Sequence, residues 1–253
     1  MSNTNKHNLP PGMQTPYNFD IKQILSRALE LSKRNNWTLA QVLICIILVT
    51  FAIYFIFIDA YGITNIEDLL TENNPLIVSQ QATIELTITC LLAPLWAGVA
   101  MLAINSYRGL KVNMSDAFYF YKQIIVLAAA SVILSITFTL GLSLYVLPGF
   151  YIFTATTFAL PLITDKKMRP FSAIIVSIKM VNKYLPKMLM LYAIFIVMFI
   201  PVLLSFGFAY LWVGPFYFNV KAILYQDLFC EKEKDPIEST KESNVGATGV
   251  FDA

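Results

Sequence analysis

Two long stretches without charge constrain this chain more than any other feature of its sequence. Residues 123–164 form a run of 42, and residues 188–220 a run of 33, in which no Asp, Glu, Lys, Arg or His occurs. Charged residues make up about 25% of an ordinary soluble domain, but they are 13% of this chain, which is 57% hydrophobic. Because a hydrocarbon core about 30 Å thick takes roughly 20 helical residues, these runs predict an all-α, polytopic membrane protein.

Each of the two runs is too long for a single crossing. At about 1.5 Å per residue, the run of residues 123–164 would make a helix about 63 Å long, so a turn is expected at "YVLPG", residues 145–149, where Pro and Gly break the pattern. The last run should turn near residues 207–215, "GFAYLWVGP". Six transmembrane helices are therefore expected, at about 39–58, 86–104, 123–145, 150–167, 188–207 and 212–229.

The positions of the cations predict the direction of these crossings. Residues 1–38, 105–122, 165–187 and the C-terminal tail hold five, three, six and three of the 18 basic residues, and Lys221 in the sixth span is the last. The segments on the other side hold none. Since cytoplasmic segments carry the excess of Lys and Arg, both termini are expected in the cytoplasm, which in a bacterium means a multi-pass protein of the inner membrane.

The same scheme divides the chain into three parts. Residues 1–18 are expected to be a disordered cytoplasmic leader, residues 19–229 the six-helix membrane domain, and residues 230–253 a disordered cytoplasmic tail. The loop of residues 59–81 faces the other side and is acidic; its acids are Asp59, Glu67, Asp68 and Glu72.

Three cytoplasmic stretches have the periodicity of amphipathic helices. They are "FDIKQILSRALELSKR" (19–34), "NMSDAFYFYKQ" (113–123) and "RPFSAIIVSIKMVNKYL" (169–185). An amphipathic helix flanked by Lys and Arg lies in the headgroup boundary with its apolar face toward the acyl chains. We therefore expect three interfacial elbow helices; the alternative is a cytoplasmic bundle that packs these apolar faces together.

No catalytic, cofactor or metal site is predicted. His7 is the only histidine, which argues against histidine-dependent triads and histidine metal sites, and no phosphate-binding or dinucleotide-binding motif is present. The net charge of +2 and the absence of a basic stripe do not indicate nucleic-acid binding. The expected partners are the lipid bilayer and a lipid or membrane-protein partner.

Polar residues inside the expected spans or directly at their ends are the candidate site, because they are costly in the membrane. The candidates are Glu85, Asn105, Asn219 and Lys221. Glu85 could be a proton or cation site or a hydrated acid at the interface, and Lys221 could bind an anion or extend toward the cytoplasm. The two asparagines could hold helices together by hydrogen bonds.

The C-terminal half also carries a family resemblance. "LPGFY", "FALPLITD", "PFSAIIVSIKMVNKYLPKML" and the final "AILYQDLF", within residues 147–229, resemble a broad bacterial group of uncharacterised inner-membrane proteins. That group is similar to the membrane domain associated with some glycerophosphodiester phosphodiesterases. The resemblance implies a six-span architecture and a role in the cell envelope, and it brings no catalytic residues.

The sequence thus predicts a non-enzymatic integral inner-membrane protein, with a role in envelope or lipid homeostasis. The alternative is a small-solute or ion transporter with a polar site at the middle of the membrane, centred on Glu85, Lys221 and the kink at Pro94. A membrane-embedded enzyme would require paired polar groups that meet at one depth.

Overall fold

The computed structural model describes residues 10, 12, 17–61 and 75–230, and within these residues the chain forms helices and no strand. The expected all-α class is confirmed. The expected leader and tail lie largely outside the described residues, as does most of the acidic loop. The elements are α2 (Ile21–Ala60), α4 (Pro75–Tyr107), the 3₁₀ helix η1 (Met114–Gln123), α5 (Ile124–Leu144), α6 (Val146–Ala155), α7 (Ala159–Lys166), α8 (Pro170–Lys183), α9 (Leu185–Leu204) and α10 (Tyr210–Phe229).

Five segments of the described chain are long and apolar enough to cross a membrane. They are Ile21–Ala60, Ser79–Tyr107, Met114–Leu144, Val146–Lys166 and Leu185–Leu204. The expected sixth span, α10, is not among them; it carries Asn219, Lys221, Gln226 and Asp227.

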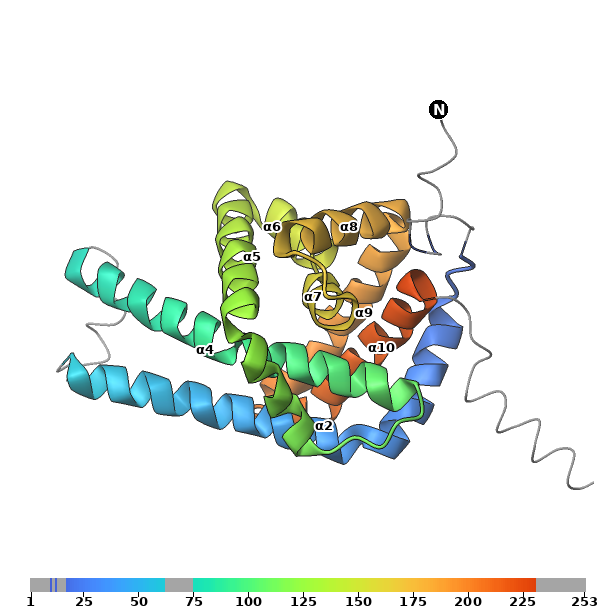
Figure 1. Ribbon diagram of the computed structural model, residues 1–253, viewed down its shortest axis with the longest axis horizontal. Helices are drawn as coiled ribbons and strands as arrows, with labels where there is room; N and C mark the ends of the chain where they lie inside the picture. Colours follow the sequence, from blue (N-terminus) through green and yellow to red (C-terminus); the bar gives the residue numbers. More distant parts are fainter. Residues whose placement is uncertain (1–9, 11, 13–16, 62–74, 231–253) are drawn as a thin grey trace, which may run out of the picture.

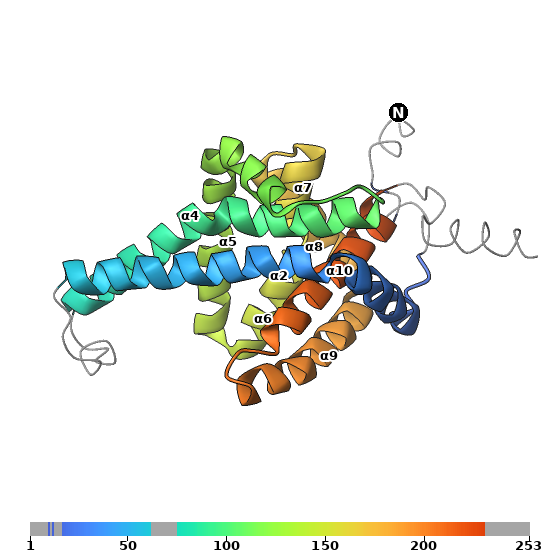
Figure 2. The same ribbon diagram turned by 90° about the horizontal axis from the view of Figure 1, so that it is seen from below.

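Helix α10 lies inside the bundle. Of its 20 residues, 12 are buried, and it packs mainly against α2 and α4 (Figure 2). A helix that is covered by other helices can carry polar side chains where those side chains find partners.

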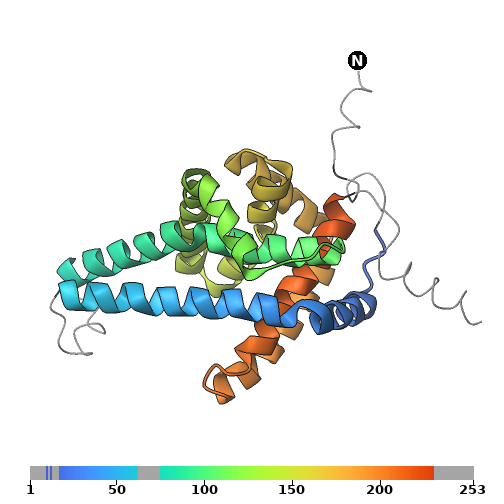
Figure 3. The ribbon, with the colours of Figure 1, turned by 60° about the horizontal axis from the view of Figure 1, so that its bottom comes forward.

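Helices α2 and α4 form a long antiparallel pair that extends beyond the rest of the molecule (Figure 1). Asp20 caps the start of α2, since its carboxylate accepts hydrogen bonds from the backbone N–H groups of Lys22 and Gln23 at 3.0 and 3.3 Å. Helix α5 runs across this pair and not along it, and the first part of α2 bends away from the rest (Figure 3).

The two expected turns are present, with a difference in detail. Helix α5 ends at Leu144 and α6 begins at Val146, so the break falls at the extended Tyr145, and the Pro148-Gly149 pair lies in the first turns of α6. The last two helices are joined by residues 205–209, where Gly207 has φ +92° and its N–H donates to the carbonyl of Val202 at 2.8 Å.

The three expected elbows differ from one another in the structure. Residues 21–34 are not a separate helix but the first part of α2, and Ile24 in their apolar face is buried against the bundle. The second stretch is the 3₁₀ helix η1, whose start is held by a 2.9 Å hydrogen bond from the Asn113 N–H to Asp116. In α8 the apolar stripe faces away from the bundle: Phe171 is 67% exposed and Ile175 is 51% exposed.

Candidate functional site

A cavity of about 680 Å³ lies between α9 and α10, with α4 and the α6–α7 segment as its other walls. Each of the two main helices contributes one face with a helical i, i+3, i+4, i+7, i+8, i+11 spacing. The lining residues of α9 are Tyr192, Phe195, Ile196, Phe199, Ile200 and Leu203, and those of α10 are Tyr210, Val213, Gly214, Tyr217, Phe218 and Lys221. The face of either helix is about 16 Å long, from eleven steps of about 1.5 Å.

The wall formed by α6 and α7 depends on a break between these two helices. The break falls at residues 156–158. The fully buried Ser177 of α8 forms hydrogen bonds with backbone groups that the break leaves unpaired. Its hydroxyl donates to the carbonyl of Ala155 at 2.7 Å and accepts from the N–H of Phe158 at 3.2 Å. The break places Thr157 in the cavity wall.

Few polar atoms line the cavity, and they lie on adjoining helices. The Tyr192 hydroxyl donates to Thr157 Oγ1 at 2.6 Å. The Tyr217 hydroxyl lies 3.4 Å from that of Tyr192, at the long limit of a hydrogen bond. The other walls are almost wholly apolar or aromatic, with Trp96 stacked on Phe218 at 6.1 Å between ring centroids.

Lys221 provides the one charged side chain among the described residues that line the cavity. Its ammonium lies over two aromatic rings, 5.3 Å from the centroid of Tyr217 and 5.5 Å from that of Phe218. No carboxylate of the described chain forms an ion pair with it. Cation–π contacts of this kind orient an ammonium, but they leave it without a counter-charge.

The four polar residues singled out from the sequence take different places. Asn219 is buried and exchanges hydrogen bonds of 3.0 Å with Asn35 of α2 in both directions, with a further one to Ser32. It therefore joins α2 to α10, as expected for a helix-joining asparagine. Glu85 is exposed on α4 and Asn105 is half-buried near the end of that helix. Of the four, Lys221 is the one that lines the cavity.

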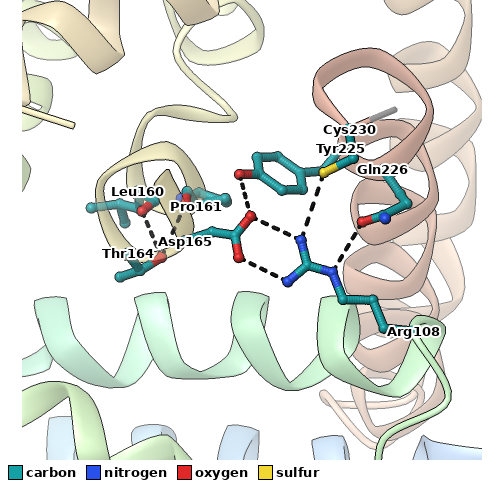
Figure 4. Close-up of polar contacts among 8 residues, drawn as sticks. All are labelled: Arg108, Leu160, Pro161, Thr164, Asp165, Tyr225, Gln226 and Cys230. Atoms are coloured by element: carbon teal, nitrogen blue, oxygen red, sulfur yellow. Dashed lines mark hydrogen bonds and ion pairs between the residues drawn. The ribbon is translucent and has the colours of Figure 1, made fainter. Parts of the chain in front are cut away.

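A charged cluster joins the C-terminal ends of α4, α7 and α10 (Figure 4). The Arg108 guanidinium donates to both carboxylate oxygens of Asp165, at 2.8 and 2.9 Å, and its Nε donates to Gln226 at 3.2 Å. The Tyr225 hydroxyl donates to Asp165 at 2.9 Å, and Arg108 also contacts Cys230 Sγ at 3.6 Å. The hydrogen bonds to Asp165 raise the pKa of Arg108 above its ordinary value, although burial opposes this.

A second cluster joins the start of α2 to Asp227, the residue of α10 that follows Gln226. Asp227 accepts hydrogen bonds from Arg27 at 3.0 Å and from the Tyr17 hydroxyl at 2.6 Å. Arg27 also donates to the Tyr107 hydroxyl. Burial, and then the nearby Asp227 carboxylate, raise the pKa of the Tyr17 hydroxyl. Three successive residues of α10, from Tyr225 to Asp227, thus hold the ends of α2, α4 and α7 together.

The sequence pattern did not reveal the cavity or these two clusters. The spacing of the cavity faces is present in α9 and α10, but the same spacing describes any helix face in a core. The pairing of Arg108 with Asp165, 57 residues apart, depends on a helix arrangement that periodicity does not specify. No family model, no curated protein and no solved structure matches this chain. What the cavity binds must therefore follow from its shape, its lining and its charge.

Proposed function

We propose that this chain is a non-enzymatic, multi-pass membrane protein that binds lipid in the cavity between α9 and α10, in a role in envelope or lipid homeostasis. The observation that carries the proposal is the cavity itself: about 680 Å³ with an almost wholly apolar lining. This volume is within the range of about 300–1,000 Å³ that holds one ligand of moderate size.

The side chains around the cavity favour a ligand that enters from the bilayer. Several lining residues are themselves exposed and apolar, including Phe153 at 46%, Ile196 at 57% and Leu203 at 69%. In water this would be an unfavourable surface. In a bilayer the same residues face acyl chains, and a lipid reaches the cavity without leaving an apolar environment.

The lipid proposal is better supported than transport of a small polar solute. Transport through a midplane site would use polar groups that are free to bind the solute. Asn219 is already paired with Asn35 and Ser32, and the cavity wall offers mostly carbon.

A cavity-filling variant tests lipid binding. Replacing Ala100, a buried residue of the α4 wall, with phenylalanine should lower the lipid that co-purifies with the protein by about tenfold. The phenyl ring occupies space that the ligand would fill, and the apolar burial that the ligand forgoes is worth about 1.5 kcal/mol or more, where about 1.4 kcal/mol is a factor of ten. The measurement is mass spectrometry of lipids extracted from protein purified in detergent. Val213→Trp, on the α10 wall, should have the same effect.

Ala129→Phe is the matched control, because Ala129 is exposed on α5 and is not part of the cavity wall. It should retain the lipid content of the parent protein. Equal lipid content in the parent, both cavity variants and the control, with all four proteins folded, would contradict the proposal.

We further propose that the membrane domain crosses six times, with α10 as the sixth span, and that both termini lie in the cytoplasm of a bacterium. The cation distribution supports this direction, and the exposed apolar stripe of α8 supports an interfacial position for that helix. Because α5 runs across the α2–α4 pair (Figure 1), these helices cannot all be parallel to the membrane normal, and the proposal requires tilted helices.

Topology reporters test the six-span arrangement. A reporter active only in the cytoplasm should give a full signal when fused after Ala253 or before Met1, and none when inserted in the loop near residue 68. The same fusions to a reporter active only outside the cytoplasm serve as the control and should give the opposite pattern. Termini on opposite sides would indicate an odd number of spans and would contradict the six-span proposal.

A further inference from the structure

The cavity has two different ends, and this difference identifies the class of ligand. On α10 the lining runs from Tyr210 to Lys221, and on α9 from Leu203 to Tyr192. Since the two helices are joined by the turn at residues 205–209, Tyr210 and Leu203 lie at one end, while Lys221 and Tyr192 lie toward the other. The cavity is thus lined by Leu203 and the Tyr210 ring at the turn, and it ends at the cationic Lys221 about 16 Å away by helical rise.

The cationic end lies near the charged end of the bundle but inside it. Lys221 is six residues before Asp227, which is about 9 Å along the helix, and Asp227 is already neutralised by Arg27. The Lys221 ammonium is therefore held apart from the ion pairs of the bundle, with aromatic rings as its neighbours. An ammonium without a counter-charge in apolar surroundings is costly, and an anionic group of a ligand would remove that cost.

We infer that the ligand is a long-chain fatty acid, bound with its carboxylate at Lys221 and its chain along α9 and α10 toward the α9–α10 turn. This inference rests on the proposed lipid-binding function and specifies its ligand. The single charge of Lys221 matches one carboxylate. The Tyr217 hydroxyl, 3.4 Å from that of Tyr192, is the neighbouring group that can donate a further hydrogen bond to that carboxylate.

The geometry favours a fatty acid over a phospholipid. The single cation at one end of a path about 16 Å long matches a ligand with a single anionic head. A phospholipid headgroup lies at the membrane surface, whereas Lys221 is placed below the ion pair of Arg27 with Asp227. A lysine is also a compact point charge, and it lacks the forked donor geometry that arginine offers to phosphate.

Quenching of Trp96 tests the inference with the full chain in nanodiscs of phosphatidylcholine. Trp96 lines the cavity, and Trp37 and Trp212, which are 71% and 65% exposed, can be replaced by phenylalanine to leave it as the one tryptophan. Dibromostearate should quench Trp96 fluorescence at saturation, oleate should reverse the quenching, and oleyl alcohol should compete at least about tenfold less well, because it lacks the charge. The Ala100→Phe variant gives the background from acid dissolved in the bilayer.

Variants of Lys221 separate the role of the charge from that of the cavity. Lys221→Met should weaken oleate competition about tenfold and leave oleyl alcohol competition unchanged, and Lys221→Arg should retain the preference for oleate. Lys179→Met, an exposed lysine of α8, should behave like the parent protein.

Other results would contradict the fatty-acid assignment alone or together with the lipid-binding proposal. Equal competition by oleate and oleyl alcohol in the parent protein, or unchanged oleate competition in Lys221→Met, would overturn the assignment of the carboxylate and leave the lipid-binding proposal standing. Quenching by dibrominated phosphatidylglycerol with none by dibromostearate would replace the fatty acid with a phospholipid. No saturable quenching by any of these amphiphiles, together with unchanged co-purifying lipid in Ala100→Phe, would overturn both.

Discussion

Replacing Asp165 with asparagine should lower the free energy of unfolding by about 3 kcal/mol, because breaking a largely covered ion pair leaves its partner charged and uncompensated. Asp165 accepts two hydrogen bonds from Arg108 and one from Tyr225 (Figure 4). Its side chain is 13% exposed and that of Arg108 is 28% exposed, so water replaces these hydrogen bonds poorly. For a chain of this length the thermal midpoint should fall by about 6–12 °C, measured by calorimetry in detergent.

A double-mutant cycle with Arg108→Met shows whether the loss of stability comes from the pair. Removing both charged groups should cost clearly less than the sum of the two single changes, since neither charge is then left without a partner. Asp59→Asn is the matched control, because Asp59 is an exposed acid at the end of α2, and its midpoint should stay within about 1 °C of the parent value. Additive effects of Asp165→Asn and Arg108→Met would show that the bidentate contact contributes no coupling energy.

Much of the architecture could be predicted from hydropathy and charge. The uncharged runs indicated the helical membrane class, because no backbone other than a helix or a closed barrel satisfies its hydrogen bonds in lipid. The turns near Tyr145 and Gly207 followed from length and from the local Pro and Gly residues. These features are local, since they depend on the composition and the length of one segment at a time.

The parts that could not be predicted depend on contacts between distant segments. The chain between Val146 and Lys166 is divided into α6 and α7 by a break that Ser177 stabilises, about 20 residues further along the chain. No local signal at residues 156–158 requires this break. The core position of α10 includes the hydrogen bond of Asn219 to Asn35, which are 184 residues apart. Lys221 was identified as a candidate from its depth in an apolar run, but its place beside Tyr217 and the cavity needed the helix arrangement.

Helix η1 packs so closely on α4 that a single added methyl group at the contact should have a large effect on stability. Gly98 of α4 faces Ala117 of η1, and a Cβ atom at Gly98 would lie 2.6 Å from the carbonyl oxygen and 2.9 Å from the Cα of Ala117. Both atoms belong to the backbone, so no side-chain rotation relieves the contact. Gly98→Ala should therefore destabilise the protein by about 2–3 kcal/mol, seen as a lower thermal midpoint in detergent, with separation of η1 from α4 as its cause.

The sign of the stability change in Gly98→Ala is informative, because the gain in helix propensity and the steric contact with Ala117 oppose each other. Alanine is the better helix former by about 1 kcal/mol, so an unobstructed Gly→Ala change in a helix would stabilise the protein. Gly214→Ala is the matched comparison: Gly214 is also a buried helical glycine, but its nearest neighbour is Leu43 Cδ1 at 2.8 Å, the mobile end of a side chain. We expect a small change there, whereas a Gly98→Ala protein as stable as the parent would mean that η1 does not rest on α4. In that case the close approach of small residues, which allows backbones to pack in the absence of a hydrophobic driving force between helices, would not be what holds η1 to the bundle.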